Sequence, residues 1–208
     1  MKKILSLFFI GLAVSVRAGG QSDAPPASEA SSPKVETLVC LRHGEKPHGG
    51  LGQLNCRGLN RALALPSVLA KYGTPQFIFA PNPTQKVDKG GYYYIRPLAT
   101  IEPTAIRLGL PVNTQFGFKE ISGLEKELRK PAYQNATVFV AWEHILLDEF
   151  AQALVKHHGG AAAQVPAWPD TDFDSIYVFK ITKDAKGKES FAFNIDHEGL
   201  DNLSETCP

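Results

Sequence analysis

A continuous apolar run near the start of the chain constrains the fold most. Residues 38–41 read Leu-Val-Cys-Leu, and the run stops at Arg42, His43 and Gly44. An unbroken apolar run of this length is typical of a strand buried on both faces, as in parallel sheets. Ligands of open α/β sheets bind beyond the carboxyl ends of such strands. The segment therefore predicts a core strand leading to an anion site. An ordinary transition from strand to loop, with a surface arginine and histidine, fits the segment equally.

Strand-like and helix-like segments alternate along the rest of the chain. Further strands are predicted at residues 77–80, 110–113, 136–144, 175–181 and 191–195, and helices at residues 57–72, 96–108, 122–129 and 145–157. Ser122 and Glu125 have the spacing of a capping box. The alternation predicts an α/β fold, a three-layer α/β/α sandwich with a mostly parallel sheet. The last two strands flank a turn and predict a C-terminal antiparallel hairpin.

Two further segments place charged groups at the same edge of this sheet. Arg96 precedes Pro97 at the start of a predicted helix, where free amides favour an anion. The strand at residues 136–144 ends in Glu143 and His144, much as the first strand ends in Arg42 and His43. Because the carboxyl ends of parallel strands point the same way, two arginines and two histidines are expected to converge.

These residue types suit the transfer of a phosphoryl group. Guanidinium groups bind phosphate oxygens through two parallel hydrogen bonds. A neutral imidazole can attack phosphorus, while a second histidine stabilises the charge on the oxygens. The sequence has no carboxylate cluster suited to magnesium and no zinc-ligand spacing, so no metal or cofactor is expected.

The ordered set of motifs resembles the histidine phosphatase superfamily, the phosphoglycerate-mutase-like proteins. The resemblance covers roughly residues 35–160 and rests on the strand entering Leu41-Arg42-His43-Gly44-Glu45, on Leu54-Asn55 with Arg57-Gly58, on Arg96-x-x-x-Thr100, and on the strand entering His144. It implies that His43 is the nucleophile that forms a phosphohistidine. It also implies that Arg42 and Arg96 clamp the phosphate and that His144 is the second pocket histidine.

The sequence departs from the family pattern at two places. Residues 84–95 intervene before Arg96, and a rival alignment would instead put Thr100 at the arginine position. The general acid is also open between Glu120, in the loop after the third strand, and Glu143. Ile145 stands where the acid-phosphatase branch has an aspartate.

The glycine-rich loop after the first strand contains two further candidates for substrate binding. Lys46 and Asn55 lie in this loop, and both also fit ordinary solvated loop positions. Tyr92, Tyr93 and Tyr94 either wall the pocket or only anchor their loop.

The N-terminus has the pattern of an export signal. Two lysines precede the apolar stretch of residues 4–16, and small residues at positions 16 and 18 predict cleavage after Ala18. Residues 19–34 lack large apolar side chains and predict a flexible linker, so the folded domain is expected at residues 35–208. We therefore expect a periplasmic or secreted protein, with an uncleaved N-terminal anchor as the alternative.

Charge and cysteines limit the partners and the compartment. The net charge of +1 gives no sign of a nucleic-acid surface. No other stretch is long and apolar enough to span a membrane, so no stable insertion is expected after signal cleavage. Cys40 lies in the apolar strand, whereas Cys56 and Cys207 lie in polar segments and could pair after export.

Together these features predict an exported, metal-independent phosphatase that hydrolyses a small-molecule phosphomonoester through a phosphohistidine. A phosphomutase, or a phosphate-binding protein without turnover, remains as an alternative. The sequence indicates neither the natural substrate nor the oligomeric state.

Overall fold

A twisted sheet forms the centre of the computed structural model, which describes residues 32–87 and 90–208. In these residues six strands form one sheet in the order β3-β2-β4-β1-β5-β6. The strands are β1 (Lys34–Arg42), β2 (Phe77–Phe79), β3 (Val112–Asn113), β4 (Thr137–Trp142), β5 (Ser175–Lys183) and β6 (Glu189–His197). β1 to β4 run parallel to one another, and β5 and β6 form the antiparallel hairpin that the sequence predicts.

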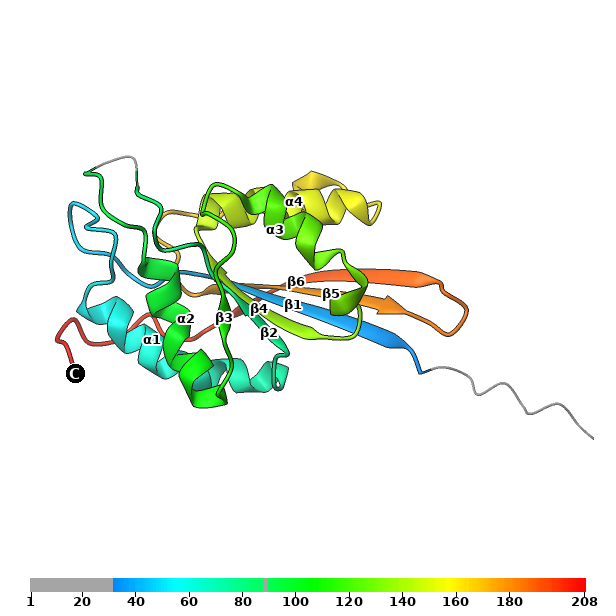
Figure 1. Ribbon diagram of the computed structural model, residues 1–208, viewed down its shortest axis with the longest axis horizontal. Coiled ribbons are helices and arrows are strands. Elements are labelled where there is room, and N and C mark those ends of the chain that lie inside the picture. Colours follow the sequence, from blue (N-terminus) through cyan, green and yellow to red (C-terminus); the bar gives the residue numbers. More distant parts are fainter. Residues whose placement is uncertain (1–31, 88–89) are drawn as a thin grey trace, which may run out of the picture. The chain divides into compact units, whose positions relative to one another are not determined.

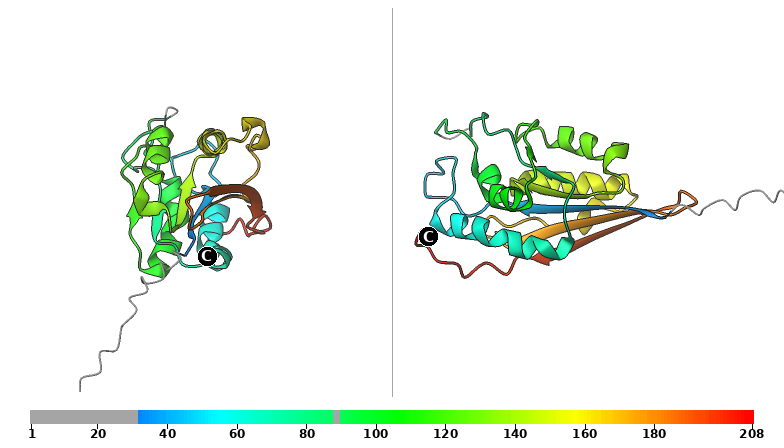
Figure 2. Two further views of the ribbon diagram at one scale, coloured as in Figure 1. Left: turned by 90° about the vertical axis from the view of Figure 1, so that its right-hand side faces the viewer. Right: turned by 60° about the horizontal axis from the view of Figure 1, so that its bottom comes forward.

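Helices cover both faces of this sheet. α1 (Cys56–Leu69) and α2 (Arg96–Leu108) lie on one face, and α3 (Ile121–Leu128) and α4 (His144–His157) lie on the other (Figures 1 and 2). Short 3-10 turns follow at Ala70–Tyr72, Pro131–Tyr133 and Ala162–Gln164. The predicted three-layer α/β/α sandwich is therefore confirmed.

β1 lies between β4 and β5 and is buried on both faces. Leu38 and Cys40 pack toward α3 and α4, and Val39 and Leu41 pack toward α1 and α2. All four side chains are at most 1% exposed. This two-sided burial explains why the sequence shows an unbroken apolar run rather than an alternating one.

The pairing of β1 with β4 sets the position of the site. The two strands are parallel, and Arg42 at the end of β1 is level with Trp142 at the end of β4. The residues that follow both strands therefore leave the sheet side by side, which brings His43 next to the start of α4.

The start of α3 differs from the sequence prediction. The helix begins at Ile121, one residue early, and Glu120 at its N-cap position makes no capping bond with its side chain. Glu125 pairs instead with Arg129 one turn later on the same helix. The predicted capping box of Ser122 and Glu125 is therefore wrong, because an i,i+4 ion pair takes the glutamate.

The C-terminal tail is fixed along α1 (Figure 2). Cys56 and Cys207 form a disulfide across 151 positions of sequence, whereas Cys40 stays reduced in the core. The Asn60 side chain donates hydrogen bonds of 2.9 Å to the carbonyls of Ser204 and Thr206. Closing so long a loop restricts the unfolded chain and contributes on the order of 4 kcal/mol in the chain-entropy model.

Part of the predicted N-terminal organisation lies outside the described residues. This applies to the signal peptide, residues 1–18, and to the linker as far as residue 31. β1 begins at Lys34, one residue before the predicted domain start. Among the residues that the structure describes, no helix combines the length and the apolarity needed to cross a membrane.

A buried carboxyl group lies at the opposite end of β1 from His43. Glu36 is 5% exposed and lines a cavity of about 180 Å³ between the sheet and the pair α3 and α4. Burial, and then repulsion by Glu189, raise the pKa of Glu36 from 4.5 to about 7. Between pH 4.5 and about pH 7, the folded state therefore keeps a proton on Glu36 that the unfolded chain has released.

Glu36→Gln is expected to stabilise the protein at about pH 8 by on the order of 1 kcal/mol and to change little at about pH 4. The sign follows from the raised pKa of Glu36. As the pH rises from the unfolded-state pKa through the folded-state pKa, the unfolded chain gives up the proton more readily than the folded protein, so the folded protein loses stability. Urea unfolding at both pH values measures the difference. Glu149→Gln, at an exposed position of α4, is the matched control, and an equal effect of Glu36→Gln at both pH values would contradict the assignment.

Candidate active site

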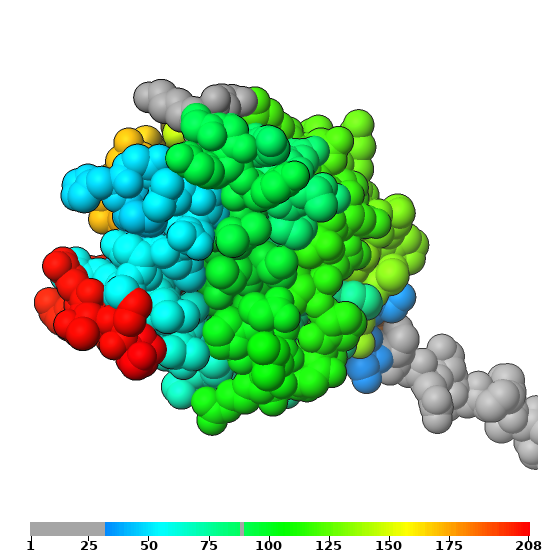
Figure 3. Space-filling model, turned by 60° about the vertical axis from the view of Figure 1, so that its left-hand side comes forward, coloured from blue at the N-terminus to red at the C-terminus, as the bar shows by residue number. Residues whose placement is uncertain are grey.

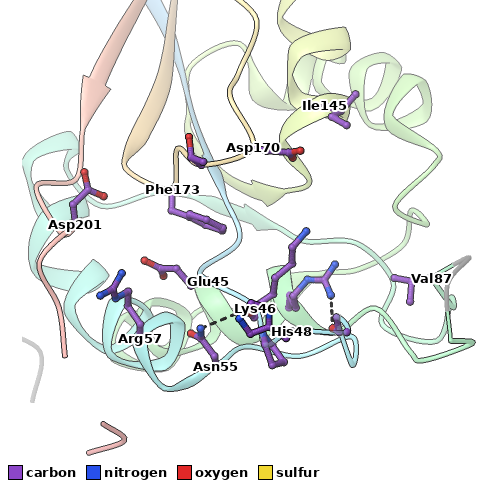
Figure 4. A pocket seen from close by; sticks show the side chains of 15 residues that line it. Glu45, Lys46, His48, Asn55, Arg57, Val87, Ile145, Asp170, Phe173 and Asp201 are labelled. Atoms are coloured by element: carbon purple, nitrogen blue, oxygen red, sulfur yellow. Dashed lines mark hydrogen bonds between the residues drawn. The ribbon is translucent and has the colours of Figure 1, made fainter. Parts of the chain in front are cut away.

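Four charged or proton-carrying side chains meet where β1 and β4 end and α2 begins. Arg42 and His43 follow from β1, His144 is the first residue of α4, and Arg96 is the first residue of α2. All four are at most 7% exposed. Arg96 lines a pocket of about 1190 Å³ together with Lys46 and Asp170, and Arg42 and His144 each contact Asp170 (Figure 4). The structure therefore brings together the residues that the sequence places at this edge.

His43 is held as a neutral imidazole with one free nitrogen. Its Nδ1 lies 2.8 Å from the carbonyl oxygen of Gly44, so Nδ1–H donates and Nε2 keeps its lone pair. Burial and the nearby charges of Arg96 and Arg42 together lower the pKa of His43 from 6.5 to about 3, against the Gly44 hydrogen bond, which raises it. A neutral imidazole is the form that can attack phosphorus.

Arg42 is fixed by the loop that connects α4 with β5. Its Nη1 donates to the carbonyls of Pro169 (3.2 Å), Asp170 (2.8 Å) and Asp172 (2.8 Å), and its Cζ lies 3.9 Å from the centre of the Phe173 ring. Nε and Nη2 are buried and have no partner within the described part of the chain. A rigid guanidinium with two unused donors is suited to an anion with two acceptor oxygens.

Arg96 and Lys46 add positive charge on the solvent side. Arg96 donates from Nη1 to the carbonyl of Gly50 at 2.8 Å and lies 4.6 Å over the ring of Tyr94, while its buried Nε has no partner among the described residues. Burial lowers the pKa of Lys46, and so do the charges of Arg96 and Arg42. The three cations repel one another, and a bound anion would relieve that repulsion.

His144 contacts a carboxylate through each ring nitrogen. Nδ1 lies 2.6 Å from Glu143 Oε1, and Nε2 lies 2.9 Å from Asp170 Oδ1. Glu143 also caps α4, since its Oε2 accepts a hydrogen bond of 3.0 Å from the Leu146 amide. Burial would raise the pKa of Glu143, but the bonds from His144 and the amides of Leu146 and Ile145 lower it to about 2.

Comparisons with known proteins identify the fold. No protein-family model and no curated protein matches the sequence. A solved structure of a mycobacterial hydrolase matches with a TM-score of 0.53 and 17% identity, over 78% of this chain and 90% of that one. Mycobacterial glucosyl-3-phosphoglycerate phosphatase, in complex with inorganic phosphate, matches with a TM-score of 0.52 and 18% identity, over 77% and 95%. A structure from Nakamurella multipartitia, described as a SixA phosphohistidine phosphatase, matches with a TM-score of 0.52 and 15% identity, over 78% and 96%.

This chain has the histidine phosphatase fold. In this fold the sequence-predicted candidates Arg42, His43, Arg96 and His144 occupy one cluster, with Lys46 at its edge. Figure 3 shows the segment after β1, in light blue and cyan, next to the C-terminal tail in red on one face of the molecule. These two segments form part of the pocket wall through Glu45, Lys46 and Asp201.

The remaining predicted residues have structural partners. Glu120 accepts a hydrogen bond of 2.7 Å from the Gly117 amide and does not line the pocket. Asn55 lines the pocket, but its side-chain oxygen caps α1 by accepting 2.8 Å from the Gly58 amide. Its side-chain nitrogen donates to the carbonyl of Lys46 at 3.4 Å, so Asn55 also shapes the loop that carries Lys46 (Figure 4).

Sequence reasoning missed the loop that closes the site from the other side. Asp170, Thr171 and Phe173 line the pocket from the connection between α4 and β5. This segment shows neither strand nor helix periodicity, and three aspartates within five residues before a strand were its one signal. The sequence likewise gave no indication that Arg61 on α1 is buried.

Proposed function

We propose that this protein is a phosphatase that hydrolyses a phosphomonoester through a phosphohistidine at His43, without a metal. One observation carries the proposal: a buried, neutral His43 lies beside two arginines whose buried donors have no partner within residues 32–87 and 90–208. The mycobacterial phosphatase with the same fold, in complex with inorganic phosphate, supports it. The cationic cluster favours a phosphoryl group and opposes a divalent metal ion.

The geometry supports a reaction in two displacements. Nε2 of His43 attacks phosphorus, and the N–P bond forms while the bond to the leaving oxygen breaks. Arg42, Arg96 and Lys46 neutralise the charge on the remaining oxygens, and His144 donates a hydrogen bond to one of them. Water then attacks the phosphohistidine, which releases inorganic phosphate and restores neutral His43. One acidic group must protonate the leaving oxygen and later accept the proton from water.

Hydrolysis of p-nitrophenyl phosphate by the purified protein in the presence of EDTA tests this proposal. We expect turnover that EDTA does not reduce and that inorganic phosphate inhibits competitively. Loss of turnover with EDTA, recovered on adding a metal, would contradict the metal-independent reaction. No turnover, combined with thermal stabilisation by phosphate, would favour a phosphate-binding protein instead.

We also propose that the protein is exported to the periplasm or secreted. The apolar N-terminal segment supports this, and the Cys56–Cys207 disulfide fits an oxidising compartment. Export also disfavours the alternative of a phosphomutase, because the sugar phosphates of central metabolism are cytoplasmic. Cell fractionation, with N-terminal sequencing of the recovered protein, tests the location and the cleavage after Ala18 together.

A further inference from the structure

We propose that Asp170 is the general acid of this reaction, an inference that rests on the phosphatase function proposed above. The mechanism requires one carboxyl group that reaches the leaving oxygen and exchanges its proton. The sequence offers Glu120 and Glu143 for this role, and the structure gives both of them other partners.

Glu143 and Glu120 are unsuited to donate a proton to a substrate. Glu143 is tied to His144 and to the first amides of α4, which keep it ionised, with a pKa of about 2. The carboxylate of Glu120 accepts from the Gly117 amide, and the residue lies outside the pocket lining.

Among the described residues three carboxylates line the pocket, and two of them contact the guanidinium of Arg61. Glu45 is held by both of its oxygens, 2.8 Å and 3.0 Å from Arg61. Asp201 lies 3.4 Å from the same guanidinium. Asp170 remains, and it is the carboxylate of this lining that contacts His144.

Asp170 combines a fixed backbone with a solvent-exposed side chain. Its carbonyl accepts 2.8 Å from the Nη1 of Arg42, which anchors the residue to the phosphate cluster. Its carboxylate meets the buried Nε2 of His144 at 2.9 Å, yet the side chain is 83% exposed. Figure 4 shows Asp170 on the wall opposite Asn55 and His48, with the side chain of Lys46 extending between them. The carboxyl is therefore open to water and at the same time lies against His144 in the cationic cluster.

The position of Asp170 also explains how it would acquire a proton. Its carboxylate occupies the contact with His144 that a phosphate oxygen would take. Two anions side by side repel, so a phosphoryl dianion favours the protonated carboxyl. The O–H proton of Asp170 passes to the leaving oxygen as the P–O bond breaks. The resulting carboxylate takes a proton from the attacking water as the new P–O bond forms and the N–P bond breaks, which returns Asp170 to its starting form.

Asp170→Asn tests this role with two substrates that differ in leaving group. An alkyl phosphate such as glycerol 2-phosphate releases a strongly basic oxygen that needs a proton, whereas p-nitrophenolate leaves without one. We expect kcat/KM, which reports the steps up to departure of the leaving oxygen, to fall about 10²–10⁴-fold for the alkyl ester and less than about 10-fold for the aryl ester. Asp170→Glu is expected to recover part of the alkyl activity.

Asp201→Asn is the matched control, since it removes another pocket carboxylate that contacts Arg61 rather than His144. It is expected to affect both substrates to the same small extent. Equal losses on both esters in Asp170→Asn, or no loss on either, would overturn the acid role while leaving the phosphatase function intact. Failure of the unaltered protein to hydrolyse either ester would overturn the proposed function and this inference with it.

Discussion

His43→Ala is expected to lower kcat for p-nitrophenyl phosphate by about 10⁴-fold or more. The imidazole is the group whose lone pair is made available by the Nδ1–H bond to Gly44, and its pKa of about 3 keeps it unprotonated at neutral pH. The phosphate clamp does not depend on it, because Arg42 is fixed by three carbonyls of the loop at residues 169–172. Phosphate should therefore still stabilise the variant against heat, which separates loss of chemistry from loss of binding.

His157→Ala provides the matched control for this experiment. His157 is an exposed histidine at the end of α4, outside the lining of the active-site pocket. His157→Ala should retain unaltered kinetics, and wild-type protein quenched during turnover in alkaline detergent, which preserves the N–P bond, should carry a phosphate that His43→Ala lacks. Retention of kcat within about 10-fold in His43→Ala would exclude the phosphohistidine, because a nucleophile cannot be replaced at such small cost.

The parts of the site that could be predicted from sequence are those set by local pattern. The apolar runs before Arg42 and before Glu143 mark two buried strands, and their parallel pairing follows from the alternation with helices. Arg96 could be placed because a proline marks the first turn of its helix. The boundary between β4 and α4 decides the role of Glu143. The strand ends at Trp142, so Glu143 caps α4.

The missing parts depend on contacts between distant segments. The loop around Asp170 meets Arg42 mainly through backbone carbonyls, which every residue type possesses, and the partners are 127 to 130 positions apart. No spacing rule can detect such a contact. A polar residue on an amphipathic helix is ordinarily solvent-exposed, so no pattern in the sequence predicts that Arg61 on α1 is buried.

Arg61 joins the catalytic loop to the C-terminal segment. Its side chain is fully buried and contacts Glu45, which lies two residues after His43. It also lies 2.5 Å from Glu198, whose side chain is fully buried as well. Asp174 and Asp201 lie 3.7 Å and 3.4 Å away. Burial raises the pKa of Glu198, and the charge and hydrogen bond of Arg61 oppose this rise by favouring the ionised carboxylate. The guanidinium therefore compensates carboxylates that would otherwise be buried without a partner.

Arg61→Met is expected to lower the free energy of unfolding by about 3–5 kcal/mol, because removing one partner of a buried ion pair leaves the other charge uncompensated. Arg57→Met is the matched control one helical turn earlier, where the pair with Glu205 is 35% and 78% exposed and should cost less than about 1 kcal/mol. Urea unfolding of both variants measures the contrast.

The loss in Arg61→Met should shrink when Glu198→Gln is added, since the amide carries no charge to compensate. Similar small losses for Arg61→Met and Arg57→Met would show instead that water or a shifted side chain replaces the guanidinium, and that Glu45 is held in place by its own loop.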